Sequence, residues 1–131
     1  MSAPNAYAAA CASRIVLDRV ADKWTVLVLG VLVRRPTRFN QLRREIEGLS
    51  QKVLSQTLKN LERDGLVTRK VFATVPVTVE YSVTSLGETL ASRMGGLLEW
   101  AEANVGEIIE AQARYDAVTP RAEREQPARV S

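Results

Sequence analysis

Residues 50–67, SQKVLSQTLKNLERDGLV, contain a helix start, an amphipathic run and a helix stop in immediate succession. Serine often caps a helix by accepting a hydrogen bond from its first turn, and glycine often follows the last turn. With about 100° between successive helical residues, the apolar positions form one narrow stripe: Leu54, Leu58 and Leu61. The stretch therefore predicts a helix that is capped by Ser50, extends to Asp64-Gly65 and turns its leucines toward a core.

A shorter helix is predicted immediately before this one. Phe39, Leu42 and Ile46 recur at spacings of three and four, which is typical of one apolar helix face. Thr37 is the expected N-cap and Gly48 the expected end. The two helices are then joined by about three residues, which is the spacing of a helix-turn-helix motif.

The chain after Gly65 changes from a helical to an extended pattern. Residues 66–72 and 78–83 are rich in β-branched and aromatic side chains, and they are predicted to pair as a two-stranded hairpin around Thr74-Val75-Pro76. A helix-turn-helix followed at once by a hairpin predicts a winged helix. In that architecture the second helix is expected to contact a DNA major groove, and the hairpin to reach the flanking backbone or minor groove.

Helices are also expected before the motif. Ser13 is the N-cap candidate for a short helix, and Asp22 for the next one. The second helix crosses the apolar run from Trp24 to Val33 and is expected to stop near Arg35, because Pro36 cannot continue it.

A long helix is expected after the hairpin. From Ser85 to about residue 110 apolar residues recur at helical intervals, with Gly95-Gly96 as a weak point. From Asp116 onward prolines, charges and small residues predominate, which is typical of disorder. The expected organisation is a flexible arm over residues 1–10, a domain over 11–112 and a disordered tail over 113–131. The fold class is mainly α with a small β-hairpin: a winged helix-turn-helix with N- and C-terminal helices.

Composition argues against catalysis. The chain has 131 residues, enough for one domain, with no histidine and one cysteine. These counts exclude a Ser-His-Asp triad, a Cys-His pair, histidine-ligated zinc or haem, and an intrachain disulfide. Nothing in the sequence converges on the carboxylates of Glu80 or Glu99, and Glu80 is expected to pair with an arginine. We therefore expect no enzyme activity, no metal and no cofactor.

No membrane or targeting segment is expected. The longest apolar run is much shorter than the roughly 20 residues that a spanning helix needs. The first ten residues lack the lysines and arginines of a signal peptide. The expected compartment is the cytoplasm.

The modest net charge of +3 hides an uneven distribution. Residues 34–70 contain ten basic and four acidic side chains, a net of +6, whereas the remaining chain carries eight basic and eleven acidic side chains, a net of −3. A basic middle in a nearly neutral chain indicates a polyanionic partner. A solvated surface without a partner is the alternative.

The face of the second motif helix opposite its leucines is basic and polar. Its residues are the DNA-binding candidates Gln51, Lys52, Ser55, Gln56, Lys59 and Arg63. Lysine and arginine neutralise phosphates or donate to guanine, glutamine pairs with adenine, and serine donates or accepts. Arg38, Arg69 and Lys70 are expected to contact flanking phosphates. The rival function is a protein-interaction module whose basic face binds an acidic protein.

The sequence resembles the HxlR family of bacterial winged-helix regulators, relatives of the MarR type. The resemblance spans residues 11–87 and is carried by Cys11, Lys23-Trp24-Thr25, Arg38-Phe39-Asn40-Gln41-Leu42, the stretches 50–58 and 61–67, Val75-Pro76, and residues 79–87. It implies a homodimer that binds inverted-repeat operator DNA, mostly as a repressor and sometimes as an activator.

The resemblance also implies dimerisation through the first and last helices. The long C-terminal helix has more apolar positions than a small winged domain can cover, which favours the same conclusion. The interface candidates are Ile15, Leu97, Trp100, Val105 and Ile108. The alternative is that this helix folds back on its own domain.

Some members of the family sense electrophiles or oxidants through an N-terminal cysteine, and Cys11 lies at the matching position. A sensing thiol needs a lowered pKa, for which a helix N-terminus and Arg14 are the expected sources. The alternative is a small buried packing residue. An oxidant or small-molecule effector is accordingly one expected partner.

Overall fold

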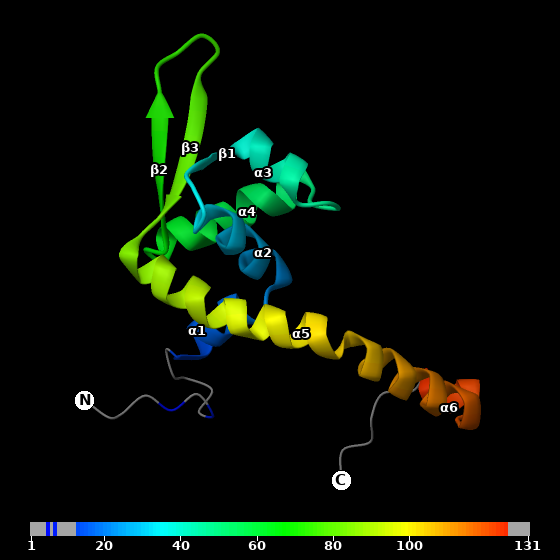
Figure 1. The fold of residues 1–131 in the computed structure, drawn as a ribbon. Coiled ribbons are helices and arrows are strands. Elements are labelled where there is room, and N and C mark those ends of the chain that lie inside the picture. Colours follow the sequence, from blue (N-terminus) through cyan, green and yellow to red (C-terminus); the bar gives the residue numbers. More distant parts are fainter. Residues whose placement is uncertain (1–4, 6, 8–12, 126–131) are drawn as a thin grey trace. The chain divides into compact units, whose positions relative to one another are not determined.

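The computed structural model describes residues 5, 7 and 13–125, and the chain forms two compact units, Met1–Gly96 and Leu97–Ser131. The elements follow in the order α1 (Ser13–Val20), α2 (Lys23–Leu32), β1 (Thr37–Arg38), α3 (Phe39–Glu45), α4 (Gln51–Arg63), β2 (Val67–Phe72), β3 (Thr78–Val83), α5 (Ser85–Val118) and α6 (Arg121–Arg124) (Figure 1). The fold is mainly helical with a small antiparallel sheet, as the sequence predicted.

The core of the first unit forms around α2, because this helix is apolar on most of its sides. Val28, Leu29 and Leu32 are almost completely buried. The predicted leucine stripe of α4 is confirmed, since Leu54, Leu58 and Leu61 all belong to this core. Thr57 lies beside this leucine stripe and is buried as well. Burial of this face leaves the opposite face of α4 outward.

The predicted boundaries of α4 are confirmed. The hydroxyl of Ser50 accepts a hydrogen bond from the Val53 amide at 3.1 Å. At the other end Gly65 has a φ of +76°, in the left-handed region that favours glycine. The Leu66 amide donates to the Leu61 carbonyl at 2.9 Å, and the Gly65 amide to the Glu62 carbonyl at 3.1 Å. These two bonds form a Schellman motif, which ends the helix.

The prediction that Thr37 caps the next helix is wrong. Thr37 and Arg38 form the short strand β1, where Thr37 pairs with Tyr81 of β3, and Arg38 occupies the N-cap position of α3. The predicted two-stranded hairpin, confirmed at β2 and β3, is therefore part of a three-stranded sheet in the order β1-β3-β2. A strand of two residues is too short to leave a periodic signal in the sequence.

Two helices of the first unit end earlier than predicted. α2 stops at Leu32 rather than near Arg35, because the Arg34 amide donates to the Val31 carbonyl at 3.1 Å and so closes the last turn with a bond of 3₁₀ type. α3 stops at Glu45, and residues 46–50 connect it to α4. Gly48 lies inside this connection with a φ of +83°, so its role is to allow the turn. The predicted cap of α2 is confirmed, because the Asp22 carboxylate accepts from the Trp24 amide at 2.9 Å.

The start of α5 is packed tightly against the end of α4. The Thr84 hydroxyl accepts from the Gly87 amide at 3.0 Å and donates to the Gly65 carbonyl at 2.7 Å. A Cβ atom on Gly87 would lie 2.1 Å from the Leu66 carbonyl oxygen. Glycine is therefore required at position 87, because only hydrogen fits between the two backbones.

α5 is longer than the sequence indicated. It continues without interruption through Gly95-Gly96 and ends at Val118, beyond the expected boundary at residue 112. α6 follows within the segment that was expected to be disordered. Helix-favouring residues continue until Thr119-Pro120, which explains the later end. Cys11 and most of the expected N-terminal arm lie outside the described residues.

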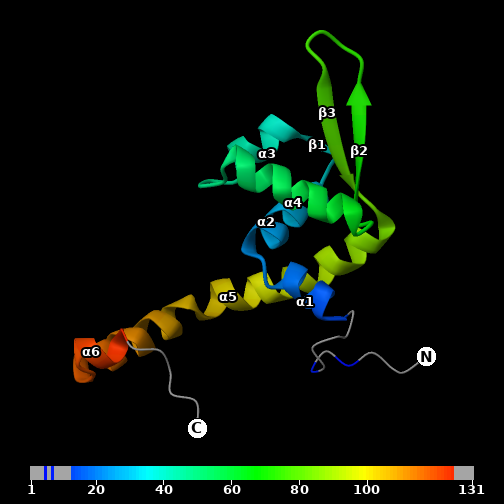
Figure 2. The same ribbon diagram turned by 180° about the vertical axis from the view of Figure 1, so that it is seen from behind.

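The hairpin β2–β3 extends beyond α3 and α4 to its turn at residues 73–77, as both ribbon views show (Figures 1 and 2). Val75 and Val77 at this turn are exposed. Within residues 13–125, no helix combines the length and the apolar character needed to cross a membrane.

Candidate nucleic-acid interface

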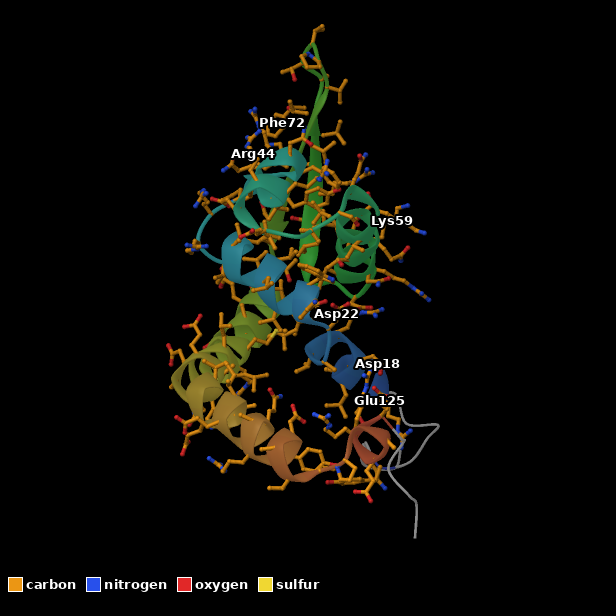
Figure 3. The ribbon with its side chains drawn as sticks, turned by 90° about the vertical axis from the view of Figure 1, so that its right-hand side faces the viewer. Asp18, Asp22, Arg44, Lys59, Phe72 and Glu125 are labelled. Atoms are coloured by element: carbon orange, nitrogen blue, oxygen red, sulfur yellow. The ribbon has the colours of Figure 1, made fainter. Side chains whose placement is uncertain are left out.

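The outward face of α4 carries all six predicted DNA-contacting residues of that helix. Lys59 projects from α4 on the side away from α2 (Figure 3). Five of the six side chains are exposed and one, Ser55, is partly buried; the exposed ones are Gln51, Lys52, Gln56, Lys59 and Arg63. The amphipathic pattern of the sequence thus corresponds to a real division between core and solvent.

The cations of this face are not neutralised by neighbouring acids. Among the residues that the structure describes, no carboxylate oxygen lies within 4 Å of the charged nitrogens of Lys52, Lys59 or Arg63. The first turn of α4 contains no acid, and the N-terminus of a helix adds positive partial charge beside Lys52. These cations therefore remain available for an anionic partner.

Asn60 is a member of this face that the sequence reasoning missed. The Gln56 amide nitrogen donates to the Asn60 side-chain oxygen at 3.1 Å. Their spacing of four residues places them side by side on a helix and was a usable signal. The bond orients the Gln56 amide, whose oxygen remains available as an acceptor.

The predicted phosphate contacts of the sheet lie on two different faces. Arg38, Glu80 and Lys70 pair across the three strands and form one row. Arg69 pairs with Tyr81 in the adjacent row, and successive residues of a strand point to opposite faces. Arg69 and Lys70 consequently cannot both contact the same phosphates from one face of the sheet.

The Lys70 row has a net positive charge. Arg38 lies directly opposite Glu80, yet within the described part of the chain Glu80 forms no ion pair shorter than 4 Å. The predicted arginine partner is thus adjacent in register but not in contact. The Lys70 ammonium lies 4.9 Å from the centroid of the Phe72 ring, two residues along the strand, which orients the cation along the hairpin.

Arg69 connects the hairpin to α4. Its Nε lies 3.9 Å from a carboxylate oxygen of Glu62, and both side chains are about half exposed. Such an exposed pair contributes less than about 1 kcal/mol. Burial raises the pKa of the neighbouring Tyr81 phenol, an effect that the Arg69 charge opposes, so this tyrosine stays neutral near pH 7. Arg69 therefore helps to orient the hairpin as well as offering charge.

The second unit presents an apolar surface along α5. The four described interface candidates are all exposed: Leu97, Trp100, Val105 and Ile108. Ile109, Tyr115 and Val118 extend the same apolar character. The side chain of Ile15, the fifth candidate, lies outside the described residues.

In the part of the chain that the structure describes, no three histidine, cysteine, aspartate or glutamate side chains gather in a way that would hold a metal ion.

A helix-turn-helix formed by α3 and α4, a following β-hairpin and a long terminal helix together define a winged-helix transcriptional regulator of the MarR-like type. The chain belongs to the HxlR-like helix-turn-helix family, whose model matches residues 19–109.

Individual relatives agree with this assignment. The HTH-type transcriptional regulator YtfH of Escherichia coli K12 is 43% identical over 105 residues, which cover 80% of this chain and 83% of YtfH. The solved structure of ytfH from Salmonella typhimurium, described as a transcriptional regulator, has a TM-score of 0.80 and 39% identity over 85% of this chain and 99% of that one. The redox regulator HypR in its oxidized form has a TM-score of 0.66 and 36% identity, covering 72% of this chain and 97% of HypR.

Proposed function

We propose that this regulator is a sequence-specific DNA-binding protein that acts as a homodimer on inverted-repeat operators. The observation that carries the proposal is the outward face of α4, where Lys52, Lys59 and Arg63 lie among amide and hydroxyl groups and have no acidic partner among the described residues. Long cations beside amides suit the edges of guanine and adenine in the major groove. Arg38 and Lys70 suit phosphates on either side.

The experiment is selection of bound fragments from genomic DNA of the source organism, followed by titration of the recovered sequence at several salt concentrations. We expect one recurring inverted repeat. Its half-sites should lie about one helical turn apart, roughly 34 Å, because a two-fold dimer presents α4 twice. The logarithm of the binding constant should fall linearly with the logarithm of the salt concentration, by about 0.9 per phosphate contacted.

The rival proposal is a winged-helix module that binds an acidic protein. The same basic face would support this rival, so only the identity of the bound partner distinguishes the two proposals. A salt-sensitive complex with a protein, together with no enrichment of any DNA fragment, would favour the rival and contradict the DNA-binding proposal.

We further propose that the exposed apolar surface of α5 forms the dimer interface. Replacing both Leu97 and Ile108 with glutamate places two charges on this surface, where burial without a partner is unfavourable. We expect the double variant to sediment as a monomer at concentrations where the wild type is a dimer, and to bind a single half-site only weakly.

A matched control is available on the same helix. Ala117 is exposed and lies about 100° or more around α5 from all four described interface candidates, so Ala117→Glu adds a charge away from the apolar surface. This variant should remain dimeric. A dimeric Leu97→Glu, Ile108→Glu variant would contradict the proposed interface.

We propose repression as the mode of regulation, on the support of the HxlR resemblance. Deletion of the gene should raise transcription from promoters that contain the selected operator. A fall in transcription would assign activation instead.

We propose that Cys11 responds to oxidants, with the similarity to the redox regulator HypR as support. Because the chain has one cysteine, any protein disulfide must join two chains. Treatment with diamide should produce a reducible covalent dimer and change operator affinity, and Cys11→Ser should abolish both effects. Oxidant-insensitive binding by the wild type would contradict this role, whatever the outcome for DNA recognition.

A further inference from the structure

A cavity of about 450 Å³ opens in the first unit, and none of the proposed DNA-contacting residues lines it. Its walls come from α1, from the turn after α4 and from the first three turns of α5. The aliphatic part of the lining consists of Val16, Leu66, Leu86 and Leu90. This volume lies within the range of about 300–1,000 Å³ that small-molecule sites occupy.

The polar part of the lining is dominated by cations. Arg19 donates through Nε to an Asp64 carboxylate oxygen at 2.5 Å, and both side chains are about three-quarters buried. Arg93, on the same face of α5 as Leu86 and Leu90, forms no ion pair within the described part of the chain. Two arginines and one carboxylate leave a net charge of +1 beside an apolar surface.

The hydrogen-bonding capacity at this cluster is only partly used. Arginine carries five N–H donors, and within the described residues Arg19 uses its Nε toward Asp64 and no other bond from its guanidinium is formed. The Thr89 hydroxyl donates to the Leu86 carbonyl at 2.6 Å, so its oxygen can still accept. A planar anion would find a forked donor at Arg93 and further donors at Arg19.

We propose that this cavity, the α1–α5 cavity, binds a small organic anion with an apolar body. Its carboxylate is held by Arg93 and the terminal nitrogens of Arg19, and its hydrocarbon part lies against Leu66, Leu86 and Leu90. Burial of the hydrocarbon supplies affinity, while the two guanidinium groups select a charged acid over its neutral analogue.

The position of Asp64 connects the cavity to α4. Asp64 is the C-cap of that helix, and a bound carboxylate shares the Arg19 guanidinium with it. Ligand binding in the cavity therefore changes the electrostatic environment at the C-terminal end of α4, the helix that the proposed function places on DNA. Only this consequence rests on the proposed function; ligand binding itself does not.

Calorimetric titration of the full chain, without DNA, tests the proposal with 2-naphthoate and the neutral 2-naphthamide as matched probes. We expect naphthoate to bind at least tenfold more tightly than naphthamide. The Arg93→Gln variant should lose most of this preference, whereas Arg114→Gln, also on α5 but outside the cavity, should retain it. Thr89→Phe, which fills the cavity, should weaken both probes.

Three results would overturn the proposal: no binding of naphthoate at millimolar concentration, equal binding of the two probes, or an unchanged preference in Arg93→Gln. The comparison of the two probes uses the wild-type protein and therefore does not depend on whether any variant folds. Since no DNA is present, a negative result here leaves the DNA-binding proposal standing, and failure of operator selection leaves the cavity proposal standing.

Discussion

Replacing Lys52 and Lys59 together with alanine is expected to weaken operator binding on the order of 100-fold or more while leaving the fold intact. Each contact of this kind contributes about 1–3 kcal/mol, and a dimer loses both contacts twice. Both side chains are exposed on α4 and make no described ion pair, so their removal costs the folded monomer little. Fluorescence anisotropy with the selected operator gives the affinity, and circular dichroism gives the melting temperature.

The control removes the same number of charges elsewhere. The double variant Arg114→Ala, Arg121→Ala also lowers the net charge by two. Both of its positions are exposed and lie outside the winged helix. This variant should bind the operator almost as the wild type does at moderate salt. If the two double variants lost affinity equally, net charge rather than the α4 face would govern binding, and the assignment of that face would be wrong.

The local signals of the sequence predicted the helices and the hairpin well because each depends on neighbouring residues. The Ser50 cap, the Gly65 stop and the leucine spacing of α4 all act within about four turns of one helix. β1 was missed because its formation depends on β3, more than forty residues later in the chain. The predicted end of α5 came too early, because the prolines and charges near the C-terminus dominate the overall composition of residues 113–131. The first of these residues, up to Val118, still form helix.

The candidate site shows the same difference between features that depend on neighbouring residues and features that depend on residues far apart in the chain. The polar face of α4 follows directly from helical periodicity, so its six residues were predictable. The opposite directions of Arg69 and Lys70 follow from strand alternation and could also have been predicted. The Arg19–Asp64 pair joins residues 45 positions apart, and no local pattern indicates it. Consequently the α1–α5 cavity, which this pair borders, could not be found before the fold was known.

Replacing Gly87 with alanine is expected to destabilise the first unit by about 3 kcal/mol or more, at the upper end of overpacking effects. The added Cβ would lie 2.1 Å from the Leu66 carbonyl oxygen and 2.6 Å from a methyl carbon of Val83. A side chain such as Val83 can rotate away, but the Leu66 carbonyl is backbone and accepts the Thr84 amide at 3.0 Å. Relief therefore requires α5 to move away from the start of β2. Urea denaturation monitored by circular dichroism measures the decrease in the free energy of unfolding.

The same substitution at Gly95 should have the opposite sign. Gly95 lies within α5 and belongs to the same compact unit, but a Cβ there would meet no atom of the described residues within 4 Å. Alanine is favoured over glycine in a helix interior by about 1 kcal/mol, so Gly95→Ala should raise the free energy of unfolding by up to that amount. If both variants gained stability, helix propensity alone would account for them, and the close approach of α5 to Leu66 would not exist in solution. A loss at Gly87 with a gain at Gly95 isolates the steric contact, because the chemical change is identical in the two variants.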